Sequence, residues 1–477
     1  MSELHYPWLE LSILVPLLGA AWVYWFKDRE LARKHTMAIC SLALVFATAE
    51  WLDFRTLDSF EAHDHWDVFS LWFHSSPLVV DELSAPLLPL VALIHLVVIL
   101  STLRTKVGRF SFSWMLFGEA VALAIFSCRG GWPLVVLALA ASIPPWVEIR
   151  RRGASPRVYA VHMLLFAVLL TSGFLLHRLF PGHSTVTLVA GALMAGAGLL
   201  RSGAVPLHCW MPDLFEKASF GTSILFATPL TGAYLIIRLV LPLAPNWGLQ
   251  SIAIISLVTA VYAAGMALVQ RESRRFFCYL FLSNASLVLV GLEMGTAVGL
   301  TGALCVWLSV GLALTGFGVT LRSVEARIGR FSLNEFHGLY EQMPTLAGFF
   351  LLTGLASIGF PATIGFVGME LLVEGVVEVY PLIGMAVVVS AALNGIAIMY
   401  AYFRVFTGRR HVAPVSLRIR PTERVAVLLL SFLILGGGIV PQPGVSSRYH
   451  AATAISKRRA SIAQPPMEHG SGATAQE

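Results

Sequence analysis

Arg201 and His208 lie in a largely apolar stretch, residues 199–238, in which Gly203 and Pro206 interrupt a helical pattern. A charged side chain and a broken backbone are both costly inside hydrocarbon. They persist only where protein or a water-filled cavity covers them. This combination of residue types therefore indicates a route for ions or protons, with Arg201 and His208 as candidate pathway residues.

A second interruption, at Gly359 and Pro361, lies in the other half of the chain and is followed by Glu370 and Glu374. The two glutamates are four residues apart and so share one helical face. Two membrane segments broken by glycine and proline in separate halves of a chain indicate a transporter built from inverted repeats, with its functional region at the breaks. The alternative is a pair of ordinary kinks, because proline and glycine are common in membrane helices.

The elements that must position these residues are membrane helices. Hydrophobic residues make up 57% of the 477-residue chain and charged residues 13%, and the mean hydropathy is +0.75. A water-soluble fold could not bury so much apolar side chain, so the sequence predicts an all-α polytopic membrane protein. Because a hydrocarbon core needs roughly 20 apolar residues per helix, we expect about 14 transmembrane helices. The expected spans are residues 8–26, 36–54, 82–103, 111–128, 132–149, 157–178, 184–204, 219–240, 249–270, 276–295, 298–321, 343–378, 380–406 and 424–442.

Basic residues cluster in the loops that follow odd-numbered spans. By the positive-inside rule those loops face the cytoplasm, so we expect a multi-pass protein of the cell inner (plasma) membrane with both termini outside the cytoplasm. The formal charge of +6 thus reports topology rather than a nucleic-acid partner. The clusters are Lys27 to Lys34, Arg104 to Arg109, Arg150 to Arg157, Arg271 to Arg275, Arg322 to Arg330 and Arg409 to Arg424.

Candidate metal ligands and reactive groups are few. His63, Asp64, His65 and Asp67 lie in the longest acidic loop, but their spacing matches no ligand pattern, and a solvated outer loop is the favoured interpretation. The five cysteines form no CxxC or Cys/His cluster. The sequence also has no nucleotide-binding glycine loop, so we expect no cofactor, no metal and no self-contained catalytic site. The first apolar run lacks the flanks of a cleavable signal peptide and should remain as a span.

Four motifs then carry a resemblance to a known family. They are VVDELSAPLLPLVALI (79–94), AVPLHCWMPDLFEKAS (204–219), QRESRRFFCYLFLSNASLVLVGL (270–292) and LNEFHGLYEQMPTLAGFFLLTGLASIGFPATIGFVGMELL (333–372). In this order they resemble the motifs of the proton-conducting membrane transporter family. That family includes the antiporter-like subunits of respiratory complex I, membrane-bound hydrogenases and Mrp cation/proton antiporters. The resemblance covers roughly residues 75 to 410.

The resemblance implies a domain organisation of about 14 transmembrane helices with two inverted five-helix repeats and with helices 7 and 12 broken. The expected division is residues 1–110 (helices 1 to 3 with the acidic outer loop), 111–245 (first repeat, helices 4 to 8), 246–410 (second repeat, helices 9 to 13), 411–445 (helix 14) and 446–477 (a disordered tail).

The family moves protons along ionisable side chains at mid-membrane, contributed by helices 5, 7, 8, 11 and 12. Such a relay works because neighbouring charges influence one another and because a buried lysine can lose its proton. In this sequence an arginine replaces the lysine of helix 7, and an arginine keeps its proton, so it can pair and polarise but cannot shuttle. The other relay positions hold groups that carry no proton. The relay positions fall on Leu139 or Ala140, Arg201, Leu230, Val310 and Leu314, and Met369.

Few other polar side chains lie within the spans. Glu119 is a lone carboxyl in helix 4, which is by default a functional-site hypothesis, and Arg201 is its expected partner. The alternative is a structural pair that locks helices 4 and 7 together. The predicted proton or ion pathway therefore consists of Arg201, Glu119, His208, Glu370 and Glu374. Among the remaining polar groups, Asn284 and Asn394 are expected to form interhelical hydrogen bonds, and His95 and His162 could carry protons or simply pack against a neighbour.

The favoured function is that of a membrane subunit in a multi-subunit proton- or cation-translocating complex, similar to the M, N and L chains of NADH-quinone oxidoreductase. Its partners would be the lipid bilayer and other membrane or peripheral subunits of a hetero-oligomer. One alternative is the membrane subunit of a two-component inorganic-carbon (bicarbonate or CO2) uptake system, which the resemblance also allows. Another is a non-conducting anchor that has kept the fold and holds a catalytic partner.

Overall fold

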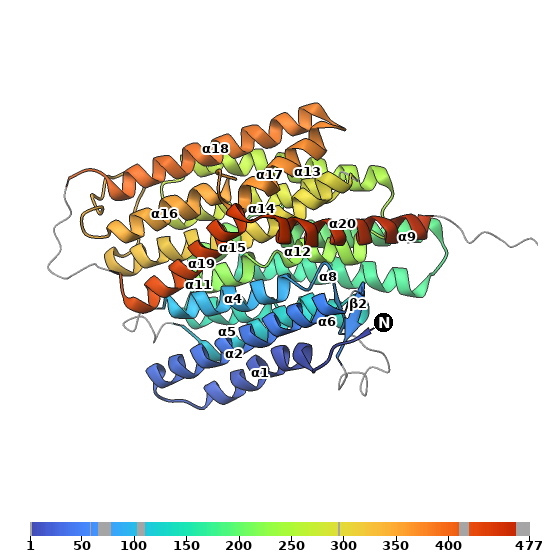
Figure 1. The fold of residues 1–477 in the computed structure, drawn as a ribbon, viewed down its shortest axis with the longest axis horizontal. Helices are drawn as coiled ribbons and strands as arrows, with labels where there is room; N and C mark the ends of the chain where they lie inside the picture. The colour runs from blue at the N-terminus through green and yellow to red at the C-terminus, as the bar shows by residue number, and fades with distance from the viewer. Residues whose placement is uncertain are drawn as a thin grey trace, which may run out of the picture.

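The computed structural model describes residues 2–57, 59–64, 78–102, 110–293, 296–409 and 419–463. Within these ranges the chain is almost entirely helical, and the helices run roughly along one axis (Figure 1). Ten helical segments of the described chain are long and apolar enough to cross a membrane, and four shorter apolar helices accompany them. The predicted all-α polytopic membrane fold is confirmed.

In the N-terminal part, α2 packs against α1 and also against the shorter, buried helix α4. α2 begins after Asp28, whose side chain accepts a hydrogen bond from the amide of Glu30 and so caps the helix. Three short strands close one end of this region, with β1 parallel and β3 antiparallel to the middle strand β2. The bounds are β1 Ser2–Glu3, α1 Trp8–Tyr24, α2 Arg29–Thr56, β2 Glu61–His63, β3 Val80–Asp81 and α4 Leu87–Leu100.

The acidic outer loop departs from the expected solvated character at Asp64. This carboxylate is buried and accepts hydrogen bonds from the amides of Leu9 (3.2 Å) and Glu10 (2.6 Å). These amides belong to the first turn of α1, where a negative charge is stabilised by unpaired N–H groups. His65 and Asp67 lie outside the described residues.

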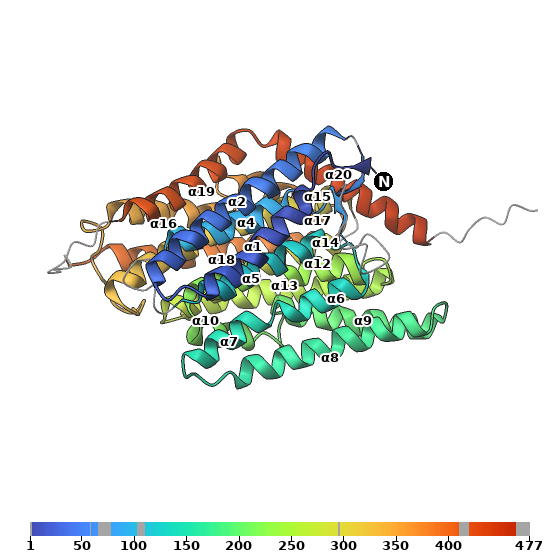
Figure 2. The same ribbon diagram turned by 90° about the horizontal axis from the view of Figure 1, so that it is seen from below.

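The next group of helices corresponds to the expected first repeat. In Figure 2, α8 and α9 form an outer layer, and α6 and α7 lie between them and the bundle. α6 and α7 are separate because Pro144 and Pro145 lack the N–H groups that a continuous helix needs. The bounds are α5 Phe112–Ser127, α6 Gly131–Ala140, α7 Ile143–Arg151, α8 Arg157–Leu179, α9 Ser184–Ser202, α10 Trp210–Lys217, α11 Phe220–Ala227, α12 Thr231–Leu235 and the π-helix η2 Ile236–Val240.

The second group contains α14 and α15, which are buried over most of their length. α16 and α17 follow α15 and are separated by six residues, and α18 covers them on one side (Figure 1). The bounds are α13 Asn246–Val269, α14 Ser273–Glu293, α15 Ala297–Ile328, α16 Pro344–Ser357, α17 Ile364–Val377, α18 Pro381–Phe406, α19 Pro421–Ile439 and α20 Gln442–Ala463.

The tail from Ser446 onward was expected to be disordered, and this prediction is wrong for residues 446–463, which belong to α20. Arg448 is buried and donates hydrogen bonds to the carbonyls of Leu83 (3.1 Å) and Glu82 (2.5 Å). Polar composition predicted disorder, but contacts with distant segments supply partners that local sequence does not reveal. Arg459 likewise contacts Asn246, so a second arginine of this segment has a polar partner.

The two ends of the bundle differ in their loops. The α1–α2 turn, the α7–α8 turn and the start of α16 lie at one end, and the strands and the α8–α9 turn lie at the other (Figures 1 and 2). The described basic clusters belong to the first of these ends, which we call the basic end. The opposite end is called the outer end below.

Candidate functional site

The first expected break separates α9 from α10. α9 ends at Ser202, and Gly203 follows with a φ of 77°, a left-handed conformation that favours glycine. A Cβ atom at this glycine would meet Leu282 Cδ2 at 2.7 Å and Met211 Cε at 2.9 Å. The amide of Val205, inside the break, donates to Thr259 Oγ1 at 3.0 Å. The unwound backbone is therefore covered and partly satisfied by α13 and α14.

The second expected break separates α16 from α17 and has the same design. Gly359 has a φ of 80°, and Pro361 follows two residues later, before α17 starts at Ile364. Ala362 also has a positive φ, 66°, which is unusual for a residue with a Cβ atom. Both breaks thus consist of a left-handed glycine, a proline and a new helix.

A third interruption lies between α11 and α12 and was not expected, because residues 219–240 read as one apolar span. Leu230 has a φ of 56°, and the carbonyl of Pro229 accepts a hydrogen bond from the indole of Trp307 at 3.3 Å. The neighbouring proline was the only local signal for this break. It opens the helix directly beside the region that holds Arg201.

Arg201 is buried at the end of α9. Its Nη2 donates to the carbonyl oxygen of Phe226 at 3.0 Å, and its Cζ lies 3.7 Å from the centroid of the Phe226 ring. The Trp210 ring lies on the same guanidinium at 5.8 Å. No carboxylate of the described residues forms an ion pair with Arg201. The charge is thus held by a carbonyl dipole and two aromatic faces rather than by an opposite charge.

Glu119 does not pair with Arg201, so the predicted pair is wrong. Its Oε2 accepts from the thiol of Cys40 in α2 at 3.0 Å, and its Oε1 has no partner among the described residues. The reason is helical rotation. Gly118 and Ala122 of α5 line a cavity beside Arg201, whereas Glu119 lies about 100° further round the helix, because an α-helix has 3.6 residues per turn.

That cavity has a volume of about 50 Å³. A cavity of this size holds water where polar partners are present, since a single water needs roughly 10–15 Å³. Its polar lining includes Arg201, His95, Glu148, Thr222 and Thr231. We call this the Arg201 cavity. The structure therefore places two titratable side chains, His95 and Glu148, on the wall of the same cavity as the buried guanidinium.

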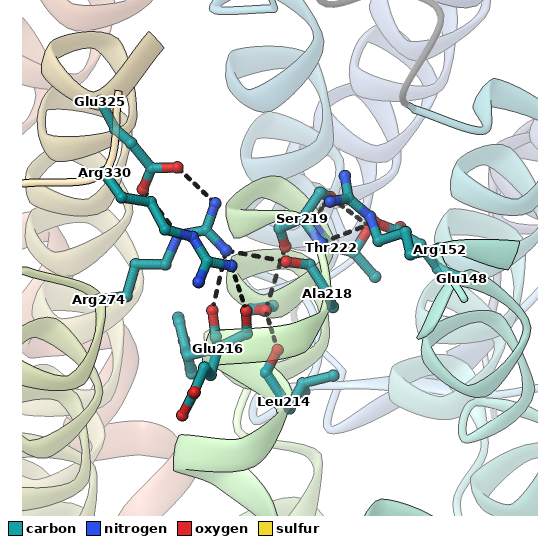
Figure 3. Close-up of polar contacts among 12 residues, drawn as sticks. Glu148, Arg152, Leu214, Glu216, Ala218, Ser219, Thr222, Arg274, Glu325 and Arg330 are labelled. Carbon is teal, nitrogen blue, oxygen red and sulfur yellow. Dashed lines mark hydrogen bonds and ion pairs between the residues drawn. The ribbon is translucent and has the colours of Figure 1, made fainter. Parts of the chain in front are cut away.

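Glu148 closes the basic end of the Arg201 cavity and was missed in the sequence. Its Oε1 accepts from Arg152 Nε (3.0 Å) and from the amide of Ser219 (2.7 Å), and its Oε2 accepts from the hydroxyl of Thr222 (Figure 3). The residue stands on α7, one turn beyond the two prolines. Its partners Ser219 and Thr222 are distant in sequence, so no local pattern marks this carboxyl.

His95, which the sequence left open as a proton carrier or a packing residue, lines the Arg201 cavity from α4. It is buried, and its Nδ1 is bonded to the carbonyl of Val91 at 2.9 Å, which leaves Nε2 as the second ring nitrogen for exchange.

The other predicted pathway residues lie elsewhere. His208 packs against the rings of Tyr262 (5.4 Å) and Tyr279 (6.1 Å), and its Nδ1 has no partner in the described part of the chain. Glu370 and Glu374 are exposed on α17. None of these three side chains lines the Arg201 cavity.

Known proteins resemble this chain over most of its length. The family described as "NADH:quinone oxidoreductase/Mrp antiporter, TM" matches residues 157–394. NADH-quinone oxidoreductase subunit M of Pseudomonas aeruginosa is 25% identical in an alignment 492 residues long. The alignment covers 92% of this chain and 94% of the relative. NAD(P)H-quinone oxidoreductase chain 4 1 of a Synechococcus strain is 28% identical and covers 92% and 91%. This chain belongs to that antiporter family. It is an antiporter-like, multi-pass membrane subunit of the complex I type.

Solved structures of the antiporter family share the fold. A chain of respiratory complex I from Thermus thermophilus with bound NADH aligns with a TM-score of 0.81 at 20% identity, over 94% of this chain and 99% of that one. A chain of the Mrp complex from Dietzia sp. aligns with a TM-score of 0.82 at 18% identity, over 95% and 98%. Identities this low establish the architecture and leave residue roles to the geometry of this chain.

At the relay positions implied by the antiporter family, the part of the chain expected to form the second repeat has neutral side chains. Val310 and Leu314 are buried apolar side chains of α15. The polar groups nearby form a small network in which Asn394 of α18 donates to Ser283 Oγ of α14 at 2.8 Å and Ser283 contacts Ser390 Oγ at 3.0 Å. As expected, Asn394 links two helices. Asn284 instead bonds within its own helix, to the carbonyl of Leu280.

An ion pair at the outer end joins η2 to β3 of the N-terminal region. Arg238 of η2 forms two hydrogen bonds with Asp81 of β3, at 2.6 and 2.8 Å. Burial opposes ionisation of Asp81, but the Arg238 guanidinium and the hydrogen bonds from Ser84 outweigh it and lower the pKa of Asp81 to about 2. The aspartate belongs to the VVDELSA motif, and its partner was not predicted.

Proposed function

We propose that this chain is a membrane subunit of a multi-subunit proton- or cation-translocating complex and that proton movement within it is confined to the first repeat. The observation that carries the proposal is the Arg201 cavity, whose wall holds Arg201, His95 and Glu148. The names of the relatives support the assembly, since they are subunits of quinone oxidoreductases. The fold neighbours come from complex I and from an Mrp complex.

The chemistry follows from the residue types. Arg201 supplies a fixed positive charge that does not discharge. Glu148 and His95 both carry titratable groups on the cavity wall, and water in the cavity would connect them. Glu148 is held by Arg152 and Thr222 at the basic end, where a proton would enter. In this proposal a proton enters at Glu148 and passes to His95, which lines the same cavity as the charged Arg201.

For Glu119 and His208 we propose contact with water rather than a place on the proton route. Each is buried or nearly so and has one polar atom without a partner among the described residues. An unsatisfied polar atom at membrane depth fits contact with water. We therefore assign them to water-accessible positions outside the Arg201 cavity, not to the route through it.

The topology proposal follows the loop charges. The basic end is assigned to the cytoplasm of a plasma membrane, which places both termini on the outer side, and the chain is divided at residues 110, 245 and 410 into the units expected from its sequence. Exposed Glu370 and Glu374 lie on a membrane helix, where carboxylates are costly unless covered. This exposure supports assembly with another membrane subunit against α17.

A second candidate function is a non-conducting anchor. The neutral relay positions of the second repeat, Val310, Leu314 and Met369, favour it. A subunit of this kind would keep the broken helices for its fold and contribute no current.

The deciding experiment is proton flux. The complex, purified through a tag on this chain, would be reconstituted in proteoliposomes containing a pH-sensitive dye. We expect Glu148→Gln to lower flux at least about tenfold, the effect of about 1.4 kcal/mol. Glu335→Gln is the matched control, because Glu335 is exposed in a loop at the basic end. Equal flux in the wild type and Glu148→Gln would reject the conducting role and leave the anchor.

A further inference from the structure

A second cavity, of about 280 Å³, lies at the basic end of the helices next to Glu148. Four arginines line it: Arg152 follows α7, Arg274 belongs to α14, Arg322 to α15, and Arg330 follows α15. Figure 3 shows the arginines Arg152, Arg274 and Arg330 on separate segments around Ser219 and Thr222. We call it the arginine cavity.

Arg274 is the structural member of the arginine cavity. Its Nε and Nη2 bond to the carboxylate of Glu325 at 2.7 and 2.5 Å, and its Nη1 donates to the carbonyls of Phe215 (3.0 Å) and Ala218 (2.9 Å). With every nitrogen engaged, this guanidinium fixes the wall between α10, α14 and α15. Its side chain gives the cavity a rigid shape.

Arg322 and Arg330 are bonded only to neutral groups in the described part of the chain. Arg322 donates to the carbonyl of Val98 (3.0 Å) and to the hydroxyl of Thr102 (2.9 Å). Arg330 donates to the backbone carbonyl of Glu216 at 2.5 Å. Each guanidinium carries five N–H donors, so both retain donors after these contacts.

The charges in and beside the arginine cavity do not cancel. The four guanidinium groups are opposed by Glu325 in the wall and by Glu148, which pairs with Arg152. Among the described residues, two positive charges are left in a partly enclosed space at the basic end. Uncompensated charges are costly there, because desolvation is only repaid by an opposite charge with good hydrogen bonds.

We propose that the arginine cavity binds a phosphate oxyanion, supplied either by the headgroup of an anionic phospholipid or by inorganic phosphate. Guanidinium groups match phosphate oxygens in planar, two-bond geometry, and Arg322 and Arg330 offer such donors from different segments. Basic pockets between membrane helices on the cytoplasmic side are a recurrent headgroup site. The volume suffices for a phosphate group with several waters, since one water occupies about 30 Å³.

The test uses the purified complex in neutral detergent after removal of bound lipid. Native mass spectrometry would count bound molecules during titration with phosphatidylglycerol, with phosphatidylcholine, or with inorganic phosphate. We expect saturable binding of one phosphatidylglycerol or of one phosphate, and no equivalent binding of phosphatidylcholine. Retained phosphatidylglycerol alone identifies the lipid as the source, whereas equal competition by inorganic phosphate identifies the free oxyanion.

Variants assign the binding to this cavity. Arg330→Gln, at the exposed rim, should weaken binding about tenfold, and the double variant R322Q/R330Q should weaken it further, because hydrogen bonds to a charged group are the strong ones. Arg157→Gln is the matched control, since Arg157 is an exposed arginine at the same end that does not line the cavity. Unchanged binding in Arg330→Gln, equal loss in Arg157→Gln, or no saturable binding of either probe would overturn the proposal. Proton flux is not part of this readout, so its outcome is independent of the translocation proposal.

Discussion

The first break has an arginine two residues before its left-handed glycine, whereas the second break has a serine at the corresponding place. Arg201 precedes Gly203 and reaches across to the carbonyl of Phe226. Ser357 precedes Gly359, and its hydroxyl donates to the carbonyl of Gly354 in its own helix at 2.6 Å. The two breaks share a left-handed glycine, but the first has a charged side chain two residues earlier and the second has a neutral one. The break therefore belongs to the fold, and only the first one carries electrostatics that could act on a proton.

The two breaks also differ in depth. Nineteen helical residues precede the first break and eight follow it, but fourteen stand on each side of the second. At 1.5 Å per residue the first break divides its helix into segments of about 28 and 12 Å, and the second divides its own into about 21 and 21 Å. The charged break thus lies nearer the basic end, where Glu148 and the arginine cavity are.

The largest expected effect follows from removing the charge of the first break. Arg201→Gln should lower proton flux of the reconstituted complex by about 10- to 100-fold, because a charged hydrogen bond contributes about 1.5–3 kcal/mol. Ser357→Ala should leave flux unchanged. Flux is measured in proteoliposomes with a pH-sensitive dye. If both variants conduct equally, the contrast between the breaks has no functional meaning.

The next effect concerns the ion pair that holds the first repeat at its outer end. The pKa of Asp81 is lowered to about 2 in the folded protein, so its stabilisation is present above the ordinary aspartate value near 4 and is lost as the pH falls toward 2. A shift of this size corresponds to about 2–3 kcal/mol. Thermal unfolding of the purified complex from pH 5 to pH 3 should therefore show a fall in Tm that Asp81→Asn lacks.

The sequence predicted most of the fold. Hydropathy located the spans, since apolar length alone decides which segments enter a bilayer, and glycine with proline located the two main breaks. It did not predict which way a residue faces: Glu119 lies one residue from a cavity-lining glycine yet contacts Cys40 on another helix. It also missed Glu148, whose importance comes from Ser219 and Thr222, more than 70 residues away. Orientation and distant partners are tertiary properties that periodicity does not determine.

A smaller effect tests what the two breaks share. Gly203→Ala and Gly359→Ala should each destabilise the protein by about 1–2 kcal/mol, because each residue has a positive φ and a close neighbour. Gly348→Ala in α16 is the control, since a Cβ there would meet nothing within 4 Å. The readout is the Tm of the complex. A large loss at one glycine and none at the other would show that the breaks do not share one backbone design.

The smallest expected effect is in the neutral network of the second repeat. Asn394→Leu removes the hydrogen bond to Ser283 together with an amide oxygen that has no partner among the described residues. Interhelical hydrogen bonds in membranes average only about 0.6 kcal/mol, so the Tm should change little and flux should not change at all. Ser283→Ala should lower the Tm more than Asn394→Leu does, because it removes the hydroxyl that contacts both the amide of Asn394 and the hydroxyl of Ser390. A loss of flux in Asn394→Leu comparable to that in Arg201→Gln would contradict the confinement of proton movement to the first repeat, because a neutral amide would then be as necessary as the buried charge.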